Sequence, residues 1–119
     1  MKRILVVEDN EDNMRLVRFI LKKRGHEVIE AGDGTEGVAL AVQEKPDLIL
    51  MDIQLPDIDG LEAMKRIRAS EADSDIPIIA LTSYAMPGDR EKALAAGCNG
   101  YITKPIDVET FMAEIEKYL

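Results

Sequence analysis

The chain has 119 residues, 46% of them hydrophobic and 32% charged, which is the composition of one globular domain with a sizeable core. Its net charge of −8 lacks the basic footprint of a nucleic-acid binder, and its apolar runs are too short to span a membrane. The N-terminus lacks the features of a signal peptide and the single cysteine allows no internal disulfide, so we expect a cytoplasmic protein with one domain over residues 1–119.

Strand and helix signals alternate along the chain. The predicted order is a strand at about 3–7, a helix to about 24, a strand at 27–31, a helix at 35–44, a strand at 47–52, a helix at 61–70, a strand at 76–81, a helix at 88–96, a strand at 100–103 and a helix at 107–118. Five strands that alternate with five helices predict a doubly wound (βα)5 fold of the flavodoxin-like kind, with a parallel sheet in the order 2-1-3-4-5.

Apolar residues at helical spacing predict which side of each helix faces the sheet. The expected inward residues are Met14, Val17, Ile20 and Leu21 in the first helix, Val38, Ala41 and Val42 in the second, Leu61, Met64 and Ile67 in the third, and Val108, Phe111, Met112 and Ile115 in the last. The helix at 88–96 is rich in alanine and has few large apolar residues, so we expect it to be loosely anchored.

Acidic residues follow two strongly apolar strands. Glu8 and Asp9 come directly after the first strand, and Asp52 ends the third. In the predicted strand order these two strands are neighbours, so the three carboxylates share one edge, and Thr82 and Lys104 flank them from the fourth and fifth strands. Each close pair of carboxylates costs roughly 4 kcal/mol at an effective dielectric near 20, so either a proton or a cation joins them.

The residue types at this edge indicate phosphoryl chemistry. Oxygen ligands with no histidine or cysteine nearby favour Mg²⁺ over zinc. An ionised aspartate beside such an ion can accept a phosphoryl group, and Asp52 is the candidate. Lys104 would help neutralise the phosphoryl oxygens and Thr82 would donate a hydrogen bond to one of them.

Five segments in the same order carry a resemblance to a known family. They are Val7-Glu8-Asp9, Asp47 through Asp52, Leu55-Pro56 through Asp59-Gly60, Pro77 through Thr82, and Gly100 through Pro105. With them the whole chain resembles a response-regulator receiver domain, and two shorter stretches, Glu8-Asp9-Asn10 and Ala85 through Asp89, resemble stand-alone cell-cycle receivers of the DivK type.

The resemblance implies a role in two-component signal transduction. It implies that Asp52 accepts a phosphoryl group from a histidine kinase or a histidine phosphotransfer protein, and that Glu8, Asp9, Asp52 and the backbone carbonyl of Gln54 hold Mg²⁺. Such a protein is a switch that assists its own phosphorylation and dephosphorylation, and is not an enzyme in the usual sense. The resemblance also implies a cis peptide bond between Lys104 and the following proline.

The same resemblance implies how the switch works. Phosphorylation pulls Thr82 inward, Tyr101 follows, and the face formed by 88–96, 100–103 and 107–118 changes shape. A downstream protein, or a second copy in a phosphorylation-dependent dimer, would bind this face. We expect the first helix and the acidic rim to dock the kinase, and we expect the bulk of Tyr84 to slow hydrolysis of the phosphoryl group.

Two motifs resemble those of proteins with other functions, and only the first leaves an alternative open. Residues 32–37 form a G-x-G-x-x-G after a strand, which is the outline of a dinucleotide fingerprint, so a small nucleotide- or flavin-binding protein is the alternative. The acids within that motif would repel a pyrophosphate, and the chain is short for such an enzyme. An EF-hand reading of Asp57-x-Asp59-Gly60 fails because its first and twelfth positions are Leu55 and Arg66. A passive interaction module is a third possibility, and nothing in its folding would require the acidic pocket.

Overall fold

The computed structural model describes residues 2–70, 75–83 and 87–119, and all ten predicted elements occur within these ranges. The elements are β1 (Arg3–Val7), α1 (Glu11–Lys23), β2 (Glu27–Ala31), α2 (Gly34–Glu44), β3 (Leu48–Asp52), α3 (Gly60–Ala69), β4 (Ile78–Thr82), α4 (Asp89–Ala96), β5 (Gly100–Thr103) and α5 (Val108–Glu116). Their bounds differ from the predicted ones by two residues at most, and no helix within the described ranges is long and apolar enough to cross a membrane.

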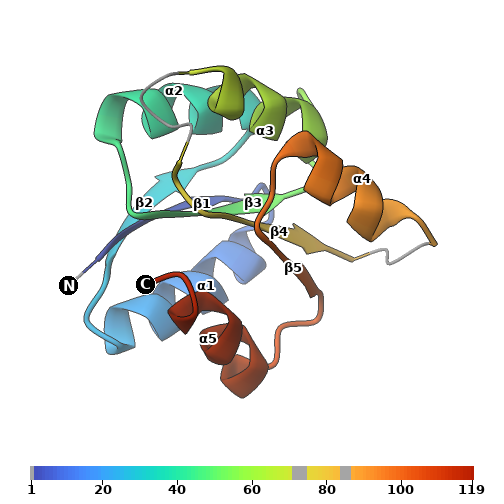
Figure 1. The fold of residues 1–119 in the computed structure, drawn as a ribbon. Coiled ribbons are helices and arrows are strands. Elements are labelled where there is room, and N and C mark those ends of the chain that lie inside the picture. The colour runs from blue at the N-terminus through green and yellow to red at the C-terminus, as the bar shows by residue number, and fades with distance from the viewer. Residues whose placement is uncertain (1, 71–74, 84–86) are drawn as a thin grey trace.

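The five strands form one parallel sheet in the order β2-β1-β3-β4-β5, as predicted. Figure 1 shows α1 and α5 on one face of this sheet and α2, α3 and α4 on the other. The register pairs Val7 with Met51 and Asp52 with Leu81, so the ends of β1, β3 and β4 lie side by side. The residues that follow these strands therefore share one edge of the sheet.

Both faces of the sheet are covered by apolar cores. Every residue of β3 and β4 is buried, as expected for central strands of a parallel sheet. The inward side of α1 is the predicted one, and so are those of α3 and most of α5.

Two residues that we predicted to face inward are exposed instead. Val42 is 40% exposed and Val108 is 44% exposed. In α2 the buried side is centred on Gly34, Gly37 and Ala41, because the helix lies so close to β1 that a Cβ at Gly37 would come within 2.7 Å of a Val7 methyl group. Val42 is turned outward as a result. Val108 is the first residue of α5, where the helix enters from solvent.

The glycine motif at residues 32–37 serves packing and capping. The carboxylate of Asp57 accepts hydrogen bonds from the backbone N–H groups of Gly34 and Thr35, at 2.8 and 2.9 Å, and from the Thr35 hydroxyl. A Cβ at Gly34 would lie 2.5 Å from Ile58. The start of α2 is thus occupied by a carboxylate from the loop after β3, which does not favour a dinucleotide at this helix.

Candidate functional site

The acidic residues predicted to meet do so at the carboxyl edge of the sheet. Glu8 follows β1 directly and Asp52 ends β3, and both are buried, at 3% and 2% exposure, while Asp9 is exposed. One ligand oxygen from each of these three residues can be chosen so that all lie within 4.8 Å of one another. The structure therefore confirms the predicted proximity.

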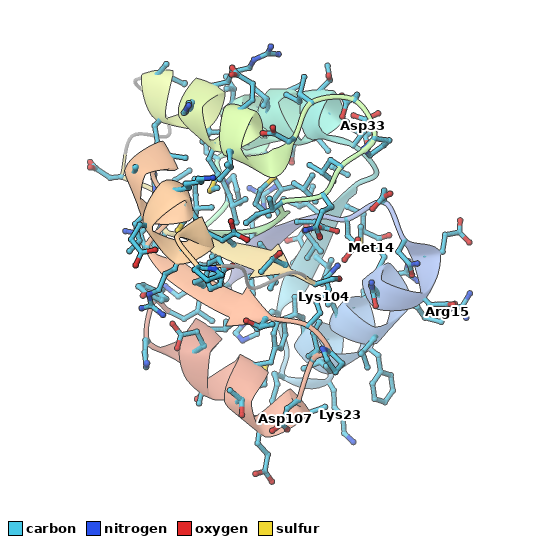
Figure 2. All side chains as sticks on the ribbon, turned by 90° about the vertical axis from the view of Figure 1, so that its right-hand side faces the viewer. Met14, Arg15, Lys23, Asp33, Lys104 and Asp107 are labelled. Carbon is cyan, nitrogen blue, oxygen red and sulfur yellow. The ribbon has the colours of Figure 1, made fainter. Side chains whose placement is uncertain are left out.

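Lys104, which follows β5, reaches into this cluster. Its Nζ donates to Oε1 of Glu8 at 2.6 Å and to Oδ2 of Asp52 at 3.0 Å. Figure 2 shows Lys104 at the edge of the sheet, between the layer of α1 and α5 and the layer of α2 and α3. The peptide bond to Pro105 is cis, as the resemblance implied.

The second oxygen of each buried carboxylate also has a donor. Oδ1 of Asp52 accepts from the backbone N–H of Gln54 at 2.9 Å, and Oε2 of Glu8 accepts from that of Asn10 at 3.3 Å. One ammonium group and two backbone donors thus surround two buried carboxylates, which leaves the cluster short of positive charge.

The protonation of the cluster reflects this shortage. The pKa of Glu8 is raised from 4.5 to about 7, chiefly by burial and then by the hydrogen bond with Asp52, while Lys104 opposes both effects. For Lys104 burial disfavours the ammonium form, but the hydrogen bonds to Glu8 and Asp52 outweigh it, so its pKa is raised. At neutral pH without a cation, the pocket therefore shares a proton that a divalent ion would displace.

The donor set suits a hard cation. The described residues that line the pocket are Glu8, Asp9, Asn10, Asn13, Asp52, Gln54, Ser83 and Lys104. Apart from the ammonium group of Lys104, their side chains offer oxygen and amide groups with no thiol or imidazole, the chemistry that favours Mg²⁺ or Ca²⁺ over transition metals. Gln54 lines this pocket, and its backbone carbonyl remains a predicted ligand.

Of the two predicted switch residues, Thr82 lies next to the cluster and Tyr101 lies beside Thr82. Thr82 is buried at the end of β4, and its Oγ1 accepts from Nε2 of Gln54 at 3.1 Å. Tyr101 packs against the core below α4, and burial raises its pKa. Its hydroxyl is buried and interacts with the Thr82 side chain, which opposes the rise in pKa, but no hydrogen bond within the described ranges has good geometry. Tyr84 lies outside the described residues.

Two contacts at the site were not predicted from the sequence. The side-chain amide of Gln54 links the loop after Asp52 to Thr82 and also accepts from the Ser83 backbone at 3.4 Å. Asp57 ties the same loop to the start of α2. Both contacts join residues more than 20 positions apart, so no local pattern could show them. The position of Gln54 two residues after Asp52 indicates only that its side chain could lie near the site.

The fold and the site define a class of protein. The model of the response regulator receiver domain matches residues 4–116, and the chain belongs to this family, which serves two-component signal transduction. It is thus a signalling domain that works with kinases and downstream partners, and not a classical enzyme.

Individual relatives and solved structures show which members of the family this chain is similar to. The chain is 46% identical over 118 residues to the polar-differentiation response regulator DivK of Brucella anthropi, and 47% identical to that of Brucella ovis, covering 99% of this chain and 96% of each relative. Among solved structures, CheY4 of Vibrio cholerae matches with a TM-score of 0.94 at 30% identity, over 100% of this chain and 99% of that one. The receiver domain of the Pseudomonas aeruginosa histidine kinase PA1611, solved with magnesium coordinated in its active-site cleft, matches with a TM-score of 0.92 at 39% identity, over 98% and 96%.

Proposed function

We propose that this chain is a phosphorylation switch in which Asp52 accepts a phosphoryl group from a histidine kinase or a histidine phosphotransfer protein. The observation that carries the proposal is the contact of Lys104 with both Glu8 and Asp52 at the edge of the sheet. A buried lysine between two buried carboxylates is an expensive arrangement for folding alone, and phosphoryl transfer gives it a use.

Glu8, Asp9, Asp52 and the backbone carbonyl of Gln54 would hold Mg²⁺. The ion, when bound, neutralises charge on the transferring phosphoryl group and on the acceptor. The PA1611 receiver, with magnesium in its cleft, supports this assignment.

The remaining chemistry belongs to side chains at the strand ends. A carboxylate oxygen of Asp52 forms a bond to phosphorus, the phosphorus–nitrogen bond of the phosphohistidine breaks, and the released imidazole takes up a proton. The ammonium of Lys104 would move from Asp52 to a phosphoryl oxygen and the Thr82 hydroxyl would donate to another, so that charge developing in the transition state meets groups already in place.

We assign the output to the face formed by α4, β5 and α5. Drawing Thr82 toward the phosphoryl group would vacate space for Tyr101, whose buried hydroxyl interacts with Thr82 without a well-formed hydrogen bond. The anchoring of α4 is weak, because its buried residues are alanines and its N-cap, Gly88, makes no side-chain capping bond. A helix held in this way can change position at little cost.

The relatives suggest the kind of output. They are named polar-differentiation response regulators, so we propose that this chain controls a differentiation process through a protein partner, in the cytoplasm. The kinase would dock on α1 and the acidic rim.

Intact-mass spectrometry after incubation with acetyl phosphate and Mg²⁺ tests the central claim. We expect one added phosphoryl group on the wild type, none on Asp52→Asn, and none on the wild type in EDTA. Asp12→Asn is the matched control, because it removes the same charge from an exposed position on α1 and should be labelled like the wild type. Equal labelling of Asp52→Asn would refute the proposed acceptor.

A further inference from the structure

On the side of the sheet opposite α4, an apolar patch lies exposed on the layer formed by α1 and α5. Phe19 of α1 is 64% exposed, and Leu16 and Val108 are exposed near it. Phe19 borders two hollows, one shared with the basic residues of α1 and one between the two helices that includes Leu16 and Val108. We call the outer surface of α1 and α5, centred on these three residues, the α1–α5 face.

The two halves of this face carry opposite charge. From residue 15 to residue 24 the chain holds five basic residues and no acid, namely Arg15, Arg18, Lys22, Lys23 and Arg24. From residue 107 to residue 116 it holds four acids and no base, namely Asp107, Glu109, Glu114 and Glu116. Figure 2 shows Arg15 and Lys23 extending from α1, and Asp107 at the start of α5.

The arrangement of the helices makes the face self-complementary. Figure 1 places α1 and α5 beside each other on one side of the sheet, and an ion pair between Arg24 and Glu116, at 3.3 Å, joins them. Both helices return from parallel strands, so they run in a common direction. A two-fold axis between them and roughly parallel to them would place α1 of each copy over α5 of the other, which matches basic with acidic residues twice.

We propose that the α1–α5 face binds a second copy of this chain in an isologous dimer. Phe19 enters the hollow beside the partner's Val108. Arg18, Arg24 and Glu114 already form ion pairs within the chain, so the charges that pair across the interface are chiefly Lys22 and Lys23 of one copy with Glu109 of the other. A nucleic acid fits this face poorly, because α5 would present acids to phosphates. The dimer shares α5 with the output face but leaves out α4, the weakly anchored helix, so we expect it to form without phosphorylation. Because α1 is also the proposed kinase-docking helix, self-association would compete with docking, and that consequence alone rests on the proposed function.

Sedimentation equilibrium without any phosphoryl donor tests the dimer. Between about 10 µM and 1 mM chain, a range suited to weak interfaces, we expect the mean mass to rise above the 13.2 kDa of one chain. Phe19→Asp should weaken association at least about thirtyfold, since it removes a central aromatic anchor. Val42→Asp, which places the same charge at an exposed valine on the opposite layer, should change it less than about twofold.

Charge reversal gives a second, independent test. Lys22→Glu/Lys23→Glu reverses part of α1, and Glu109→Lys reverses part of α5, all at exposed positions. Each variant alone should fail to associate, while an equimolar mixture should associate like the wild type, because reversed residues then meet reversed residues and native residues meet native ones.

Three results would overturn the proposal. The first is a mass of 13.2 kDa at every concentration. The second is an equal loss of association in Phe19→Asp and Val42→Asp. The third is a mixture of the two charge-reversal variants that associates no better than either variant alone. Association that appears only with a phosphoryl analogue such as beryllofluoride, and is lost in Leu94→Asp, would place the contact on α4 and overturn it as well. Circular dichroism and melting temperature confirm that each variant is folded.

Discussion

Replacing Asp52, the proposed acceptor, should make the metal-free protein more stable. Asp52 raises the pKa of Glu8 on top of the effect of burial, and the total change from 4.5 to about 7 corresponds to about 3 kcal/mol against the ionised form. Burial accounts for the largest part of this energy and Asp52 for a smaller part. Asp52→Asn removes the part due to Asp52 but also weakens one contact with Lys104, so we expect a net gain in the free energy of unfolding of about 1 kcal/mol at pH 8. For a chain of this size the melting temperature should rise by about 4 °C.

The pH dependence of this gain has a definite sign. The folded state binds a proton at Glu8 between pH 4.5 and about 7, where the unfolded state has lost it, so the contribution of Glu8 to stability falls as the pH rises through that window. Asp52→Asn should lessen this fall. The advantage of the variant over the wild type should therefore be largest at pH 8 and shrink as the pH falls toward 5.

Urea unfolding in EDTA and in Mg²⁺ measures both effects. At ten times its dissociation constant, Mg²⁺ should stabilise the wild type by about 1.4 kcal/mol, which offsets or reverses the advantage of Asp52→Asn. Asp12→Asn, at an exposed site, should stay within about 0.5 kcal/mol of the wild type throughout. Asp52→Asn less stable than the wild type at pH 8 in EDTA would contradict the reasoning, because it would mean that the cluster is satisfied without a cation.

Three further substitutions test the framework around the site. Asp57→Ala should lower the urea midpoint at pH 7, and the deficit should close as the pH falls below 3.8, since hydrogen bonds from Thr35 hold the pKa of this carboxyl below its usual range and protonation removes its advantage. Gly37→Ala should cost about 1–2 kcal/mol in chemical unfolding, because its Cβ would crowd β1; no loss would contradict the packing. Arg68→Met should cost about 2–4 kcal/mol, since three carbonyl oxygens lose a charged donor, whereas Arg66→Met, at an exposed ion pair, should cost under about 0.5 kcal/mol.

The site could be predicted from the sequence because of a general property of parallel sheets. Once the strands were located, their carboxyl ends had to meet at one edge, and the strand order placed Glu8 beside Asp52. Lys104 followed from the same rule, although its simultaneous contact with both carboxylates is visible only in the structure.

The errors have physical causes. Helical spacing shows which residues share a side but does not show how closely a helix approaches the sheet. In α2 the closeness is set by Gly37, a residue that apolar periodicity ignores, so Val42 faces outward. The hydrogen bonds of Asp57 to the start of α2 were not predicted, because its partners, Gly34 and Thr35, precede it by more than 20 residues. Contacts of this length depend on the fold and not on local sequence.

The last prediction asks whether the hydroxyl of Tyr101 stabilises the folded protein. Its buried hydroxyl makes no well-formed hydrogen bond within the described ranges, so Tyr101→Phe should leave the free energy of unfolding unchanged or raise it by up to about 1 kcal/mol. Tyr118→Phe is the matched control. It removes a hydroxyl that donates to the carbonyl of Asn99 at 2.7 Å, and should lose about 1 kcal/mol.

Urea unfolding of the two variants side by side decides the matter. An equal loss in both would mean that the Tyr101 hydroxyl is satisfied in the resting state, and would remove the reason to expect it to move. A loss confined to Tyr118→Phe would mean that the folded state gains nothing from this hydroxyl where it lies. A buried hydroxyl that does not stabilise the resting state is free to serve a second state. In that state Thr82 is drawn toward Asp52 and Tyr101 moves into the space that Thr82 leaves.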